Sequence, residues 1–190
     1  MLTAIRRALD KKNLEKKNRA LVKQLERMAV RDPLTGLYNF RHLHICLDEE
    51  ITRSERHGKT FCIVMLDIDN FKAINDTYGH LFGNHVLKKL GEIMHGNLRA
   101  VDSLYRYGGE EFLILMPETY SQGAEIVVER LMTAIREHIF SCDGHKVNIT
   151  VSMGVSVFPD KANDKRELIR LADQALYRAK EKGRDRVMFA

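Results

Sequence analysis

The stretch Thr60–Lys72, TFCIVMLDIDNFK, decides the fold. Its first part, residues 60–67, is an apolar run rich in β-branched residues and too short for a buried helix, which predicts a strand covered on both faces. A loop and a short helix over 70–77 are expected next. A fully buried central strand with helices packed against it predicts a fold of the α/β class, arranged as an α+β sandwich.

The other elements follow from periodicity and turn residues. Asp32-Pro33 ends an N-terminal helix, because proline disfavours helical geometry in the residue before it, so the domain is expected to span residues 32–190. Gly108-Gly109 joins two strands of a predicted hairpin. Helices are expected at 40–57, 83–98, 121–139 and 166–182, and strands at 103–107, 111–116, within 146–157 (one long strand or a pair) and at 186–189. Helices and strands in mixed order predict one central mixed sheet flanked by helices.

Residues 1–31 are expected to form a long helix. Residues 2–30 contain no Gly or Pro, and Leu14, Leu21 and Met28 recur every seven residues with Asn18 in the same seam. This pattern is typical of a short coiled coil whose polar residue fixes the register. The start of the helix runs out of phase with this seam, which leaves open that it is the last helix of an upstream receiver domain.

Charge and composition exclude several classes of function. The chain has 190 residues and a net charge of +5. Residues 1–31 hold ten Lys or Arg against three acidic residues, a charge of +7, which leaves −2 for the domain. A near-neutral domain argues against binding a polynucleotide, which requires a basic face. The longest apolar run, residues 61–66, is too short to cross a membrane, and no signal peptide is visible, so we expect a cytoplasmic protein.

The string Tyr107–Phe112, YGGEEF, places two glycines and two carboxylates at a tight turn. Glycine accepts positive φ and lets a backbone approach a phosphate closely. Successive acids on a strand point to opposite faces, so only one can face a given site. Taken alone, the turn is more typical of a surface hairpin with solvated acids.

The end of the central strand is a candidate metal site. An ionised Asp67 at the end of a buried strand needs a partner, and a hard cation held by Asp67, the carbonyl of Ile68 and a hairpin carboxylate would supply one. Such a Mg²⁺ site uses few protein ligands and leaves room for phosphate oxygens. For Asp69 we favour hydrogen bonds to the turn over a metal.

Five ordered segments resemble one family. They are DPLTGLYN (32–39), DIDNFKAINDTYGH (67–80), RYGGEEF (106–112), VSMGVS (151–156) and ADQALYRAKEKGRDRV (172–187). Together they resemble the GGDEF family of diguanylate cyclases over nearly all of residues 31–190. The resemblance implies a fold similar to the polymerase and adenylyl cyclase palm. It also implies a homodimeric nucleotidyltransferase in which each domain binds one nucleoside triphosphate, and each 3′-hydroxyl attacks the opposite α-phosphate with release of pyrophosphate.

The resemblance also assigns roles to residues. Asp67, the Ile68 carbonyl and Glu110 match the ligands of Mg²⁺ or Mn²⁺, with Glu111 a further candidate, and Glu110 matches the proton acceptor. Phe71 and Lys72 match the phosphate loop, where Lys72 would stabilise the transition state. Lys180 and Arg184 resemble the residues that hold the β- and γ-phosphates; outside this context they would be solvated charges near a helix C-terminus.

Base recognition departs from the family pattern. The substrate-contacting positions are Asn75, His80 and Asn84, but the family usually has Asp at position 84. A carboxylate accepts from both N1–H and the amino group of guanine, whereas an amide offers one acceptor and one donor. We therefore expect relaxed base choice, with ATP used beside GTP and cyclic GMP-AMP made beside cyclic di-GMP. The alternative is that neighbouring residues preserve guanine selection.

A second candidate site lies before the hairpin. Arg99 and Asp102 have the spacing of the family's product-inhibition site, where Arg grips phosphate or guanine and Asp accepts from the base edge. In isolation the pair is an ordinary ion pair at a helix end. Arg130 is a candidate for a second contact to the product, supplied by a partner domain. The alternative is that Arg130 is an ordinary solvated charge. The alternative function is a catalytically silent module that binds cyclic di-GMP.

Overall fold

The computed structural model describes residues 30–190. The predicted helix of residues 1–31, with its coiled-coil seam, lies outside the described residues except for its last two positions. Among residues 30–190 no helix is long and apolar enough to cross a membrane.

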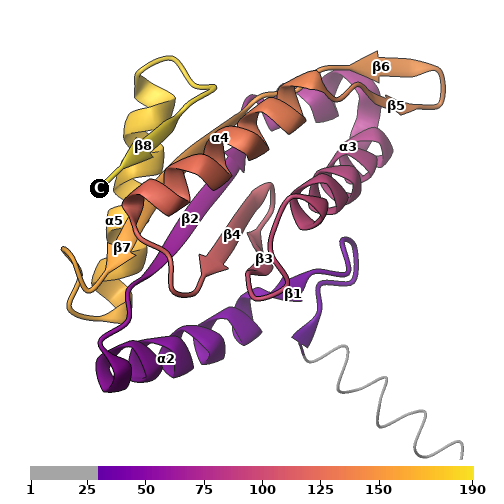
Figure 1. The fold of residues 1–190 in the computed structure, drawn as a ribbon. Coiled ribbons are helices and arrows are strands. Elements are labelled where there is room, and N and C mark those ends of the chain that lie inside the picture. The colour runs from indigo at the N-terminus through magenta and orange to yellow at the C-terminus, as the bar shows by residue number, and fades with distance from the viewer. Residues whose placement is uncertain (1–29) are drawn as a thin grey trace, which may run out of the picture.

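A six-stranded mixed sheet forms the centre of the domain, in the order β1-β3-β4-β2-β7-β8 (Figure 1). Its strands are β1 (Tyr38–Asn39), β2 (Phe61–Ile68), β3 (Ser103–Gly108), β4 (Glu111–Met116), β7 (Val151–Phe158) and β8 (Val187–Phe189). β2 is antiparallel to both of its neighbours, and all of its residues are buried. β1 and β8 pair in parallel with β3 and β7. The predicted buried central strand and mixed sheet are confirmed.

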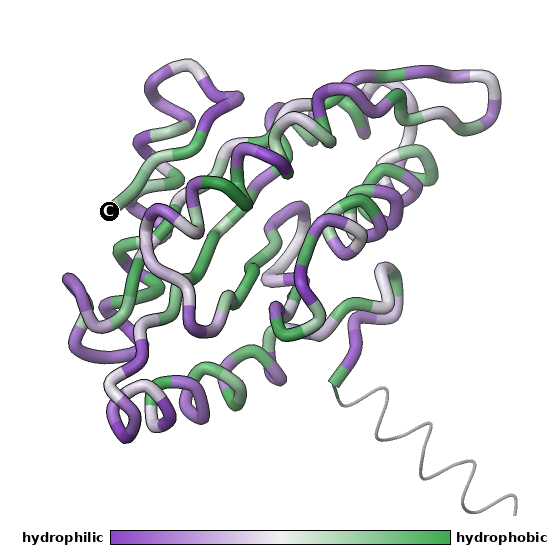
Figure 2. Tube along the Cα trace, viewed as in Figure 1, coloured by the Kyte–Doolittle hydropathy of each residue, from purple (hydrophilic) through white to green (hydrophobic). Residues whose placement is uncertain are grey.

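Within residues 30–190, four helices cover the two faces of this sheet. They are α2 (Phe40–His57), α3 (Phe71–Gly96), α4 (Ser121–Glu137) and α5 (Lys165–Glu181). Side chains on β2 alternate between the faces, so that Val64 and Leu66 pack with α3 and α4, and Ile63 and Met65 pack with α2 and α5. In Figure 2 the hydrophobic colour follows the central strands, and the hydrophilic colour lies mainly on outer helix turns and loops. The α+β sandwich predicted from the sequence is confirmed.

Some element boundaries differ from the prediction. The two helices expected at 70–77 and 83–98 are the two parts of α3, which breaks at Gly79, where φ is 83° and ψ is 158° and the backbone is not helical. α4 ends at Glu137, and a hairpin of β5 (Phe140–Cys142) and β6 (His145–Val147) follows. Asp143 and Gly144 turn this hairpin with positive φ angles, and this Asp-Gly signal in the sequence was overlooked. β1 has two residues and is too short to produce a periodic pattern.

Candidate active site

Two carboxylates face each other where β2 ends. Asp67 on β2 pairs in register with Glu111 on β4, so their side chains lie on the same face of the sheet. Both follow the alternation that points Met65 and Leu113 toward α2 and α5. Glu110 precedes Glu111 in the turn, where Gly109 has a φ of 47°. Both hairpin acids therefore lie near Asp67, with Glu111 directly across from it.

Lys180 of α5 meets this acidic strand end. Its Nζ lies 2.9 Å from Oδ2 of Asp67, and the Asp67 side chain is 10% exposed. The contact joins the predicted metal ligand Asp67 to the predicted phosphate ligand Lys180, although 113 positions in the chain separate them. Three elements, β2, β4 and α5, thus converge on one point.

The acids at this point carry more negative charge than Lys180 offsets. Burial raises the pKa of the Asp67 carboxyl; Lys180 opposes this, and Glu110 and Asp69 add to it. Burial also raises the pKa of Glu111, with the Asp67 carboxylate as the next cause. Half-buried like charges of this kind favour the protonated forms or a bound cation.

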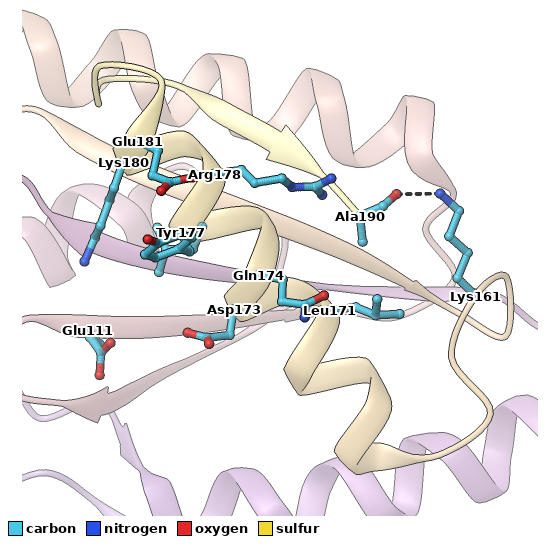
Figure 3. Close-up of a pocket in the computed structure, with 11 residues that line it drawn as sticks. Glu111, Lys161, Leu171, Asp173, Gln174, Tyr177, Arg178, Lys180, Glu181 and Ala190 are labelled. Atoms are coloured by element: carbon cyan, nitrogen blue, oxygen red, sulfur yellow. Dashed lines mark hydrogen bonds between the residues drawn. The ribbon is translucent and has the colours of Figure 1, made fainter.

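A cavity of about 740 Å³ adjoins Glu111 and Lys180 and runs along α5. Figure 3 shows Glu111 from β4, and Asp173, Tyr177 and Lys180 from α5, among the side chains that line it. Asp173 and Tyr177 were not singled out in the sequence, where they look like ordinary exposed positions of an amphipathic helix.

The loop after β2 leads into an open helix end. Asn70, the residue before α3, has a φ of 55° and makes no side-chain capping hydrogen bond. The first N–H groups of a helix lack partners within it and attract anions. Phe71 is buried at this end and the Lys72 side chain is exposed, so the predicted phosphate loop is at a helix N-terminus.

The carboxylate of Asp69 accepts three hydrogen bonds, but from other partners than expected. Its Oδ1 accepts from Ser152 Oγ at 2.7 Å, and its Oδ2 accepts from Thr150 Oγ1 at 2.7 Å. Oδ2 also accepts from the main-chain N of Asp185 at 3.0 Å. The prediction of hydrogen bonds to its own turn was wrong in its partners, because the tertiary fold brings β7 and the segment after α5 to this carboxylate.

The predicted base-contacting residues all lie on α3, around its kink at Gly79. His80 is exposed and Asn84 is half-buried. Asn75 packs against Gly83: a Cβ on Gly83 would lie 2.0 Å from Oδ1 of Asn75. The predicted base residues lie on the helix that follows β2, whereas Lys180 reaches Asp67 from α5, which covers the opposite face of the sheet.

Arg184 follows α5 in a left-handed conformation, with a φ of 63°. Its N donates to the Ala179 carbonyl at 3.0 Å, and its side chain is exposed. The structure brings its segment to the loop after β2, through the Asp185–Asp69 contact.

The three predicted product-inhibition residues lie close together within this one domain. Oδ2 of Asp102 accepts from the Arg99 main-chain N at 2.9 Å, and Oδ1 is buried without a hydrogen-bond partner among the described residues. Burial raises the pKa of Asp102, while Arg99 and Arg130 oppose this. Arg130 donates to the Asn97 carbonyl at 2.6 Å, so it approaches this cluster from its own domain.

Arg106 holds the glycine turn and was missed in the sequence. It donates to the Gly109 carbonyl through Nε at 3.0 Å and Nη2 at 2.8 Å. Its Nη1 also contacts both carboxylate oxygens of Asp32 at 3.1 and 3.2 Å. Arg106 therefore connects the start of the domain to the turn that carries Glu110.

A mixed sheet between two helix layers, with acids at the end of its central strand, defines a GGDEF-type α/β domain. The family model described as "Diguanylate cyclase, GGDEF domain" matches residues 29–186. The chain belongs to the GGDEF-domain family of diguanylate cyclases, which confirms the resemblance seen in the sequence.

Relatives and solved structures agree with this assignment. The chain is 43% identical to diguanylate cyclase DgcP of Pseudomonas aeruginosa over 163 residues, which cover 85% of this chain and 24% of DgcP. It resembles the crystal structure of P. aeruginosa diguanylate cyclase SiaD with its activator SiaC, with a TM-score of 0.82, 38% identity, and coverage of 96% and 70%. The coiled coil and GGDEF domain of DgcB from Caulobacter crescentus, in complex with c-di-GMP, gives a TM-score of 0.88, 29% identity and 97% coverage of both chains. The chain spans less than half the length of the curated relatives it matches.

Proposed function

We propose that this domain joins two molecules of GTP into cyclic di-GMP and releases pyrophosphate. One observation carries the proposal: Asp67, Glu111 and Lys180 converge from three elements beside the open N-terminus of α3. A triphosphate needs both a cation and positively charged or N–H donors, and this arrangement offers acids for the first and Lys180 with α3 for the second.

The donor chemistry fits a hard divalent cation such as Mg²⁺. Within residues 30–190, no three or more His, Cys, Asp or Glu side chains form a group able to hold a metal by themselves. Mg²⁺ commonly uses one or two carboxylates and takes its other ligands from water and substrate phosphates. Asp67, Ile68 through its carbonyl and Glu110 would hold it, with Glu111 as the alternative hairpin acid. Once bound, the metal would polarise the α-phosphate and favour ionisation of the attacking 3′-hydroxyl.

The side chains around this point would share the remaining work. Glu110 would accept the proton of the 3′-hydroxyl, and Lys72 would stabilise charge that develops on the phosphate in the transition state. Lys180 and Arg184 would bind the β- and γ-phosphates. Each domain holds one nucleotide in this scheme, so the reaction requires a homodimer.

Base choice is proposed to be relaxed, with ATP as a second substrate. Asn84 offers one donor and one acceptor, which can match adenine as well as guanine. An Asn84→Asp change restores an acceptor for two guanine donors. We expect it to raise the preference for GTP over ATP by roughly tenfold or more, the value of one charge-assisted hydrogen bond. An unchanged GTP/ATP ratio of kcat/KM would contradict relaxed choice through Asn84.

The cluster of Arg99, Asp102 and Arg130 is proposed to bind the cyclic dinucleotide product as a feedback ligand. Support comes from Asp102 Oδ1, a buried acceptor without a partner among the described residues. Such a group costs free energy until a donor reaches it, and a guanine edge carries suitable donors.

The test is product analysis by mass spectrometry after incubation with Mg²⁺ and GTP, ATP, or an equimolar mixture. Cyclic di-GMP from GTP is the expected result, with cyclic GMP-AMP from the mixture if base choice is relaxed. A dimer that binds cyclic di-GMP but forms no product would support the alternative, a catalytically silent binding module.

A further inference from the structure

The segment after α5 is held in an unusual backbone conformation. Gly183, Arg184 and Asp185 have φ angles of 108°, 63° and 47°. Glycine adopts this region freely, whereas the other residues pay a steric cost. Contacts from the rest of the fold must therefore hold Arg184 and Asp185 in place.

Arg136 of α4 supplies one set of contacts. Its Nε donates to the two carboxylate oxygens of Asp185 at 2.8 and 3.0 Å, and its Nη2 donates to the Asp185 main-chain O at 2.9 Å. A planar guanidinium that binds a side chain and its own main chain fixes the orientation of both. The two side chains are 43% and 37% exposed, so the pair contributes little to overall stability.

Asp69 supplies the contact on the other side. Its buried carboxylate accepts from the N of Asp185 and is itself held by Thr150 and Ser152. Asp69 lies two residues after Asp67 and two before Phe71. Asp69 on one side and Arg136 on the other therefore fix Asp185, the neighbour of Arg184, while the main chain of Arg184 also contacts the Ala179 carbonyl and the Arg186 side chain.

We propose that Arg136 and Asp185 are positioning residues that hold Arg184 toward the triphosphate. The proposal rests on the proposed function, in which Arg184 binds the β- and γ-phosphates. Arg136 acts through Asp185 and the backbone of the strained segment. Without Arg136, we expect the segment to keep its contacts with Asp69, Ala179 and Arg186 but to lose the one that fixes the Asp185 side chain, so that Arg184 is held less firmly.

The experiment is a double-mutant cycle on the full chain. The variants are Arg136→Ala, Arg136→Lys, Arg184→Ala and the double variant Arg136→Ala/Arg184→Ala. The control is Arg170→Ala, which removes a similar exposed Arg–carboxylate pair with Glu167 on α5. Each is measured for the Kd of Mg²⁺–3′-deoxy-GTP, which lacks the attacking hydroxyl, for kcat and KM with GTP, and for Tm.

We expect Arg136→Ala to raise Kd and KM about tenfold, the loss of one charge-assisted contact to phosphate, with a much smaller change in kcat and Tm. Arg136→Lys should recover only part of the loss, because Lys lacks the forked geometry. In the Arg184→Ala background, Arg136→Ala should have no further effect, because the two act through the same contact. Arg170→Ala should match the wild type.

Two results would overturn the positioning role. One is a Kd for Arg136→Ala within twofold of the wild type; the other is an effect that persists in full without the Arg184 side chain. A wild-type chain that neither binds 3′-deoxy-GTP nor converts GTP rejects the proposed function, and the positioning role with it. If the wild type binds 3′-deoxy-GTP and Arg136→Ala binds it with the same Kd, the positioning role is rejected and the proposed function is not.

Discussion

At the scale of single residues, the site is a group of carboxylates whose negative charge the neighbouring Lys180 offsets only in part. Asp67 and Glu111 are paired across two strands, Glu110 is close to them, and Lys180 is the cation that contacts Asp67. Such an arrangement costs stability and is retained where a ligand uses it. The acids that destabilise the domain through their mutual repulsion would therefore bind a cation.

Replacing Glu111 by Gln should stabilise the domain in the absence of divalent metal at pH 7. Its pKa is raised in the folded state, so the wild type loses stability as the pH rises through this pKa, and Gln does not. The gain in Tm should shrink as the pH falls below the folded pKa, where the wild-type carboxyl is protonated, and it should shrink or reverse when Mg²⁺ is added. Each 1 kcal/mol corresponds to a shift of roughly 2–4 °C for a domain of this size.

Thermal unfolding from pH 4 to 8, with and without Mg²⁺, measures this effect. Glu125→Gln on the exposed face of α4 is the matched control and should show no Mg²⁺ dependence. A lower Tm for Glu111→Gln at pH 7 without metal would contradict the charge argument.

Gly83 is predicted to place the side chain of Asn75. A Cβ at this position would lie 2.0 Å from Asn75 Oδ1 and 3.2 Å from Phe71 Cζ, so Gly83→Ala must displace Asn75. We expect KM for GTP to rise roughly 2- to 10-fold, the value of one hydrogen bond. Gly96→Ala, with nothing within 4 Å of its Cβ, is the control and should leave KM unchanged. Equal KM values for the two variants would exclude this role of Gly83.

At the scale of elements, the backbone of α5 approaches the sheet closely at Gly154. A Cβ on Gly154 of β7 would lie 2.1 Å from the Ala172 carbonyl O and 2.2 Å from the Leu176 N. Both atoms are helix backbone, which cannot move aside as a flexible side chain can. Close approach at this point lets α5 cover β2 and β7 and carry Lys180 to Asp67.

Gly154→Ala should therefore push α5 off the sheet. We expect a loss of unfolding free energy of about 3 kcal/mol or more, at the upper end for overpacked cores, or failure to fold. Urea unfolding measures it, with Gly108→Ala as a control because no atom lies within 4 Å of its added Cβ. A loss below 1 kcal/mol would mean that α5 can shift without cost.

At the scale of the whole molecule, the proposed reaction needs more than one domain. In that proposal Asp67 and Lys180 would hold one triphosphate, but a cyclic dinucleotide contains two nucleotides joined by two bonds. Two domains would therefore have to meet with their strand ends facing.

Specific activity should then rise with protein concentration until the dimer is saturated. The test is to measure initial rates at fixed saturating GTP over a hundredfold range of protein concentration. The molecular mass is measured by light scattering at the same concentrations. Activity per chain that stays constant while the chain is shown to be monomeric would contradict the two-domain scheme.

The sequence by itself determined most of the long elements and the family. The buried run of β2, the bounds of α2 and the hairpin over Gly108-Gly109 depend on local alternation, periodicity and turn chemistry, which are all visible in a single chain. The five matching segments indicated the GGDEF family, which the comparisons confirm.

Only the tertiary structure decided which of these residues meet. The contacts of Lys180 with Asp67, Arg106 with Asp32 and Arg136 with Asp185 join positions that are far apart in the chain. Asp69 likewise found partners on β7 and after α5, and not in its own turn. The physical reason is that local pattern reports which face of an element is buried, whereas the partner of a charged group depends on how helices and strands pack around the whole sheet.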